Sequence, residues 1–201
     1  SKGKILNKLK HKGKNKIKSG TQITFTPDPE IFGKELNFKP EKIYELSKNK
    51  AYLERGVKVI WECNKSLLNR KSQIPIKETL FYPKGLEDFI KNEIKQNNVL
   101  HEKVCFQSGK FENNKGRMEF AMQFNKNKIK YGKAFCNTVY NMNGGTHDAG
   151  FRSGIAKSIR KYAKNKNNKI VCKATQDDIF DQTAYVISIH IANPEFEGQT
   201  K

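Results

Sequence analysis

Residues 146–165 read THDAGFRSGIAKSIRKYAKN, and this stretch decides more of the fold than any other. One apolar stripe recurs in it at helical spacing: Phe151, Ile155, Ile159 and Tyr162. The basic side chains lie mostly off that stripe. A helix of this kind buries its apolar stripe against another layer, so the pattern predicts a long helix packed on a sheet. Its basic face is then left to solvent or to phosphate groups.

Alternating apolar and polar residues on both sides of this helix predict the strands of the sheet. We expect strands over residues 20–26, 57–63, 77–82, 104–112, 117–125, 133–139 and 184–191. The turn sequence Asn113-Asn114-Lys115-Gly116 favours an antiparallel pair of the two strands beside it. Further helices are expected from Pro40 to about Gly56, over 85–94 and, as a short turn, over 177–182. Together these elements predict an α+β protein.

A polar, aperiodic segment from Asn64 to Pro75 is typical of a linker. We therefore expect two domains, residues 1–64 and residues 65–201. A chain of 201 residues could form one large domain or two small ones, and 36% hydrophobic content is enough to build a core.

The net charge of +19 indicates a polyanionic partner, which could be nucleic acid, a nucleotide or an anionic membrane. A second interpretation stays open, because lysine far outnumbers arginine and many of these lysines could simply solvate the surface. Forked contacts to phosphates and bases usually favour arginine.

Neither a membrane span nor a local cysteine motif is visible. No apolar run approaches the roughly 18 to 20 residues that cross a bilayer, and no signal peptide is present. The widely spaced cysteines form no Cys-x-x-Cys pair and are expected to be buried thiols in a reducing compartment: Cys63, Cys105, Cys136 and Cys172. We expect a cytoplasmic protein. The lack of an initiator methionine indicates a fragment of a longer one.

Evidence for catalysis is thin when the residues are taken by themselves. No phosphate-binding Walker loop is present, and the four histidines lack the spacing of metal ligands. His147 follows Gly144-Gly145 at an expected helix start, where free N–H groups favour an anion, although the spacing alone favours a purely structural helix cap over 144–148. The final Gly198-Gln199-Thr200-Lys201 combines a glycine that allows close approach with a lysine suited to a phosphate.

Four segments follow one another in an order that is more specific than any of them alone. They are SKGK (1–4), GTQITFTPDPEIF (20–32), NGGTHDAGFR (143–152) and NPEFEGQTK (193–201). This series resembles the ATPase subunit of bacterial type IIA topoisomerases, the family shared by DNA gyrase and topoisomerase IV. Residues 50–53 and 181–186 are more similar to the topoisomerase IV type.

The resemblance implies a fold for each domain. Residues 1–64 correspond to the C-terminal part of a GHKL (Bergerat) ATPase domain. Residues 65–201 correspond to a transducer domain, whose fold in the family is like that of ribosomal protein S5 domain 2.

It also implies roles for single residues. Gly20 and Thr21 would belong to the adenine pocket, with the Thr21 hydroxyl bonded to the base region through water. Gln199 and Lys201 would form the catalytic loop that reaches the ATP γ-phosphate, the lysine touching it and the glutamine in support. The family's catalytic glutamate, magnesium-binding asparagine, adenine-binding aspartate and ATP lid would lie before Ser1. This chain alone is then expected neither to bind ATP well nor to hydrolyse it.

The partners implied by the resemblance belong to the whole enzyme. They are ATP with Mg²⁺, DNA, the DNA cleavage subunit of topoisomerase IV and a second copy in an ATP-dependent dimer, in the cytoplasm at the nucleoid. We expect no metal ligand within this chain. The basic helix could line a cavity for captured duplex, or could only be solvated, through Arg152, Lys157, Arg160 and Lys161.

Three other readings remain beside ATP-driven decatenation and relaxation of DNA. One is the B subunit of DNA gyrase, which introduces negative supercoils. Another is a stand-alone S5-like nucleic-acid-binding module, whose binding would ignore ATP. The third is a GHKL relative of the MutL or Hsp90 kind, against which the Gly-Gly-Thr-His and Gly-Gln-Thr-Lys combination argues.

Overall fold

A computed structural model describes most of the chain. The described residues are 7, 8, 10, 13, 19–33, 38–69, 72–94, 98–112, 115–126 and 130–196. They divide into two units, Ser1–Phe38 and Lys39–Lys201, which are treated separately below. Residues 39–64 therefore group with the second unit in their contacts. The domain boundary after residue 64 stays a prediction.

The first unit contains one short helix among its described residues. Helix α1 (Pro29–Phe32) begins after Asp28, whose Oδ1 accepts a hydrogen bond from the Glu30 amide at 2.9 Å. The predicted strand over residues 20–26 is wrong: no strand is assigned there, and Ile23 is 80% and Phe25 69% exposed. A half-buried strand needs a hydrogen-bonded neighbour, and the described part of this unit offers none.

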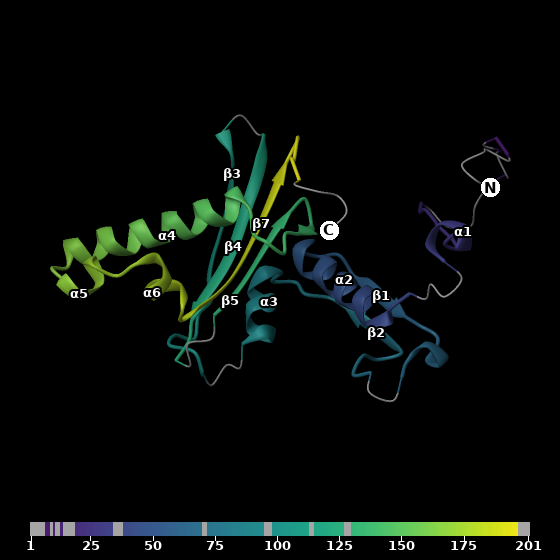
Figure 1. The fold of residues 1–201 in the computed structure, drawn as a ribbon, viewed down its shortest axis with the longest axis horizontal. Helices are drawn as coiled ribbons and strands as arrows, with labels where there is room; N and C mark the ends of the chain where they lie inside the picture. The colour runs from purple at the N-terminus through teal and green to yellow at the C-terminus, as the bar shows by residue number, and fades with distance from the viewer. Residues whose placement is uncertain are drawn as a thin grey trace. The chain divides into compact units, whose positions relative to one another are not determined.

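A five-stranded sheet forms the centre of the second unit (Figure 1). Its strands are β3 (Cys105–Lys110), β4 (Gly116–Phe124), β5 (Tyr131–Cys136), β6 (Val139–Tyr140) and β7 (Thr183–Ile191). Their spatial order is β3-β4-β7-β5-β6, so the last strand in the sequence lies in the middle. All neighbours are antiparallel except β5 and β7, which run parallel. The predicted strands 104–112, 117–125 and 184–191, and the antiparallel pairing of the first two, are confirmed.

Helices cover both faces of this sheet (Figure 1). Ala184 and Val186 of β7 join a core with α3 (Leu86–Glu93). The alternate residues of β7 point the other way, where Tyr185 and Ile187 join a second core with α4 (Thr146–Asn165). Strand alternation thus divides one strand between two cores. The predicted long helix and its packing on a sheet are confirmed.

Helix α2 (Pro40–Leu53) and a hairpin of β1 (Val59–Glu62) and β2 (Lys77–Leu80) complete the larger elements. Tyr52 fixes α2 to α3, since its ring is stacked between Tyr82 and Phe89 at centroid distances of 3.8 and 4.5 Å. Such aromatic stacking adds to the burial of apolar area. Three short helices remain: the 3-10 turn Lys65–Leu67, α5 (Lys169–Cys172) and α6 (Gln176–Phe180).

The cysteines are free thiols, but the prediction that all of them are buried is wrong. Cys136 is buried, Cys63 and Cys172 are partly exposed, and Cys105 is exposed. Cys105 lies on β3, which has a neighbour on one side only in the described sheet and presents most of its side chains to solvent. A thiol on such an edge strand has little surface to pack against.

The start of α4 lacks a side-chain cap. Gly144 has φ +72°, a left-handed value that favours glycine, and Gly145 is the N-cap residue without a capping hydrogen bond. The Nε2 atom of His147 is buried and has no hydrogen-bond partner. Burial lowers the pKa of His147, and the neighbouring Asp148 opposes this only in part. The imidazole is therefore kept neutral in the fold.

The lowered pKa of His147 predicts that stability falls as pH drops below its ordinary value near 6.5. The unfolded state binds the proton more readily, so protonation favours unfolding. The cost is below about 1.4 kcal/mol per pKa unit, because the half-exposed ring is screened by solvent. Urea unfolding of wild type and His147→Gln, followed by circular dichroism at about pH 7.5 and about pH 5.5, checks this. The variant should lose less stability on acidification; equal losses would show that His147 titrates normally.

Candidate functional site

A cleft of about 690 Å³ lies between the start of α4 and the end of β7. Its walls include Cys136, His147, Ile189, Ile191, Glu195 and Phe196. Burial raises the pKa of the Cys136 thiol, so this group stays protonated and is a poor nucleophile. The cleft adjoins the last described residues before Gln199 and Lys201. It offers binding space and no evident catalytic group.

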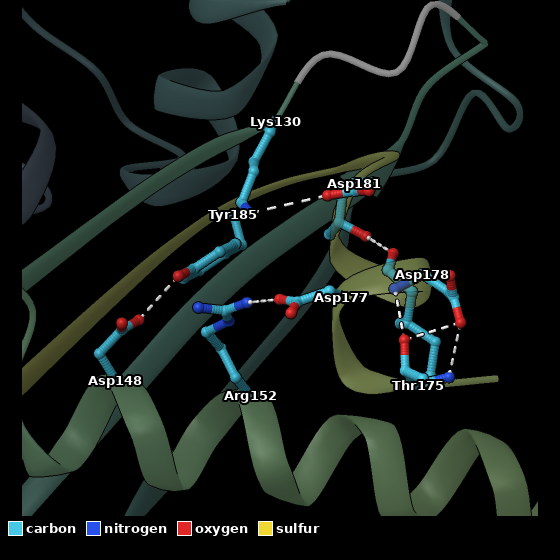
Figure 2. Close-up of polar contacts among 10 residues, drawn as sticks. Lys130, Asp148, Arg152, Thr175, Asp177, Asp178, Asp181 and Tyr185 are labelled. Carbon is cyan, nitrogen blue, oxygen red and sulfur yellow. Dashed lines mark hydrogen bonds and ion pairs between the residues drawn. The ribbon is translucent and has the colours of Figure 1, made fainter.

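A partly buried hydrogen bond anchors the first turn of α4 to the sheet (Figure 2). The Tyr185 hydroxyl of β7 donates to Asp148 Oδ1 at 2.8 Å. Burial is the main cause that raises the pKa of Tyr185 well above its usual range, so the phenol remains a donor. The ring lies flat against Gly132 of β5, where an added Cβ would come within 2.6 Å of it. Gly132 is therefore needed for this contact.

The two arginines predicted to meet DNA are held by the protein itself. Arg152 Nη2 donates to Asp177 Oδ1 at 3.0 Å (Figure 2). The Arg152 guanidinium also lies 5.0 Å from the centroid of the Phe180 ring. Arg160 Nη1 donates to the carbonyl oxygen of Ala174 at 3.0 Å. Both contacts attach the α6 region to α4.

Lysine supplies the free positive charge on this helix. Lys157 and Lys161, the other two predicted DNA residues, are exposed. Four more exposed lysines, which we call the distal lysine cluster, follow at the end of α4 and in and after α5: Lys164, Lys166, Lys169 and Lys173. No acidic residue occurs between Asp148 and Asp177. Positive charge is therefore concentrated around this cluster. The sequence signal for the distal lysine cluster is the absence of Asp and Glu over residues 149–176, which a search for helical periodicity does not detect.

The residues predicted to contact nucleotide are not brought together by the described structure. Gly20 and Thr21 lie in the first unit, outside any helix or strand, and are exposed. Gln199 and Lys201 fall outside the described residues. Within the described ranges, no cluster of His, Cys, Asp or Glu suits a metal ion. No helix there is both long and apolar enough to cross a membrane.

Comparison with known proteins identifies the family to which this chain is similar. Residues 85–201 match the family described as DNA gyrase B. The chain is 38% identical over its whole length to the B subunit of DNA topoisomerase 4 from Rickettsia typhi and 39% identical to that from Rickettsia felis. It spans about 30% of the length of each.

A solved structure supports the fold. The chain resembles the 43K ATPase domain of Thermus thermophilus gyrase B, solved in complex with an aminocoumarin, with a TM-score of 0.66 and 27% identity. The match covers 86% of this chain and 45% of that one. It confirms the predicted mixed α and β fold of the GHKL type. Since the family match spans more than half of the sequence, the chain belongs to the DNA gyrase B family.

Proposed function

We propose that this chain is part of the ATPase subunit of topoisomerase IV, which couples ATP binding and hydrolysis to DNA strand passage. The observation that carries the proposal is the whole-length similarity to two proteins of that name, together with the ordered motifs from Ser1 to Lys201. The resulting activities would be decatenation and relaxation. The B subunit of DNA gyrase is the second candidate, because the matching family carries its name.

The nucleotide would act through the residues that the family resemblance singles out. Thr21 offers a hydroxyl for the adenine region, and Lys201 offers an ammonium group for the γ-phosphate, a donor set whose chemistry fits ATP. Bound ATP would offer its γ-phosphate to Lys201, and loss of that phosphate on hydrolysis would remove this charge-assisted contact. Gln199 would support the lysine. A contact that exists only with triphosphate favours one arrangement of the two domains and releases it after hydrolysis. The residues that bind Mg²⁺ and those that hydrolyse ATP would lie in another part of the subunit.

DNA would contact the basic side of α4 through phosphates alone. Lys157, Lys161 and the distal lysine cluster are exposed and lie in a region without acids. Arg152 and Arg160 would act indirectly, because their guanidinium groups already hold α6 and the segment before it. Flexible ammonium groups suit backbone contacts that need no sequence reading. The further partners would be the DNA cleavage subunit of the enzyme and a second copy of the ATPase chain, in the cytoplasm.

Replacing Lys201 tests the nucleotide role. We expect Lys201→Ala in the full-length protein, reconstituted with the DNA cleavage subunit, to lower ATP turnover on the order of 10²-fold, the cost of removing one donor to transition-state charge. Decatenation should fall with it, while circular dichroism stays unchanged. Lys84→Ala removes an exposed lysine elsewhere and serves as the control. Undiminished turnover in Lys201→Ala would make this lysine structural and remove the assignment.

The DNA role predicts a change in salt dependence. Lys164, Lys169 and Lys173 are changed together to Gln, and duplex binding is measured by fluorescence anisotropy at several KCl concentrations. The slope of log K against log salt should shrink by about 0.9 for each phosphate that is no longer neutralised. The control changes Lys58, Lys77 and Lys84 to Gln, with the same reduction of charge. Equal slopes in both triple variants would mean that net charge, rather than this surface, attracts DNA.

Binding that ignores ATP throughout would favour a stand-alone nucleic-acid module.

A further inference from the structure

The turn between β5 and β6 has an unusual backbone. Asn137 has φ +48° and Thr138 has φ +65°. Asparagine adopts such left-handed values fairly readily, but a β-branched threonine does so rarely. Among the described residues only Asn167, in a turn after α4, shares this property without being glycine. Backbone strain of this kind persists where surrounding contacts hold it, and it often marks a functional position.

Asn137 is held by the last residue of β7. Its Nδ2 donates to the Ile191 carbonyl and its Oδ1 accepts from the Ile191 amide, both at 2.9 Å. The Asn137 amide also donates to the Ile189 carbonyl at 2.8 Å. Regular pairing of β5 with β7 ends at Cys136 and Ile189, so the side-chain amide takes the place of the next strand residue. It satisfies both backbone groups of Ile191, which a strand end would otherwise leave open.

Thr138 connects the same turn to α2. Lys50 of α2 donates a hydrogen bond to Thr138 Oγ1. Earlier on the same helix, Glu45 pairs with Lys133 of β5 at 3.5 Å. The turn therefore contacts an element of the predicted ATPase part, residues 1–64, on one side and the end of β7 on the other. Two adjacent residues join them.

We propose that the Asn137–Thr138 turn is a positioning element for the γ-phosphate contact. The chain leaves β7 at Ile191, and Lys201 follows ten residues later. By fixing both hydrogen-bonding groups of Ile191, Asn137 sets the point and direction from which the chain leaves β7. Thr138 ties that departure point to α2 through Lys50. The inference rests on the proposed function of Lys201, and it assigns positioning residues that touch no nucleotide.

The test compares affinities for triphosphate and diphosphate in the full-length protein. A non-hydrolysable ATP analogue and ADP are titrated into wild type, Asn137→Asp, Asn137→Gly, Lys50→Met and Lys201→Ala. Asn137→Gly keeps the positive φ but removes the clamp. It should weaken the analogue by up to roughly 10- to 100-fold, which is the worth of one hydrogen bond to a charged group. ADP affinity should not change. Asn137→Asp keeps the acceptor for the Ile191 amide but places a carboxylate oxygen against the Ile191 carbonyl, so it should also weaken the analogue without weakening ADP.

Two controls separate positioning from folding. Asn167→Gly makes the same substitution at the other left-handed asparagine and should leave both affinities unchanged. Lys50→Met alters only a surface side chain, so it keeps the proposal testable if Asn137→Gly does not fold; it should weaken the analogue without weakening ADP. Lys42→Met, also exposed on α2, is its control.

The outcomes also distinguish this inference from the proposed function. If Lys201→Ala weakens the analogue while the Asn137 and Lys50 variants bind both nucleotides like wild type, the positioning role is overturned and the proposed function stands. If Lys201→Ala itself has no effect, both fall. Equal weakening of analogue and ADP in Asn137→Gly would show a general structural defect and would also overturn the positioning role.

Discussion

The hydrogen-bonded ladder of β7 is the interaction on which the second unit depends. β7 pairs along its length with β4 on one side and through six residues with β5 on the other. Ala184, Val186 and Ile187 are completely buried. Because alternate side chains enter opposite cores, this one strand holds α3 on one face of the sheet and α4 on the other. The cleft, the Tyr185 anchor and the Asn137 clamp are all positioned relative to β7.

Arginine and lysine have divided roles on α4. The planar guanidinium groups of Arg152 and Arg160 suit fixed acceptors, and both are used to hold nearby protein segments. Lysine ammonium groups are strongly hydrated and flexible, so they remain in solvent. The frequent preference of phosphate for arginine therefore gives little guidance on this helix. The fold has already used the groups that make the most directional contacts.

Much of the second unit could be predicted from the sequence, because its elements follow simple periods. The apolar stripe of α4 and the alternation in β4 and β7 are strong local signals. Residues 20–26 alternate equally well, yet the described structure has no strand there, since alternation says nothing about whether a partner strand is available. The sequence pattern also missed the left-handed pair Asn137 and Thr138, because the dipeptide Asn-Thr does not predict a positive φ at threonine. The turn is held by contacts distant in sequence, from Asn137 to Ile191 and from Thr138 to Lys50.

The candidate site was predicted less completely for a similar reason. The proposed phosphate contacts of Gln199 and Lys201 rest on a resemblance, whereas their proposed support comes from distant parts of the sequence. Asn137 and Ile191, whose hydrogen bonds define the end of β7, are 54 positions apart. The tie between Tyr185 and Asp148 spans 37 positions. Such pairs follow from topology, which the local sequence does not encode.

The central place of β7 also constrains how the protein is made. Gly116 of β4 pairs with Ile191, so the sheet joins residues that the ribosome adds far apart in time. Until β7 has emerged, β4 and β5 have no strand between them and the apolar stripe of α4 has no complete surface to cover. Sheets built from such distant pairs close slowly, and their unpaired strands are open to aggregation meanwhile. The nascent chain would thus be most in need of a chaperone just before β7 appears.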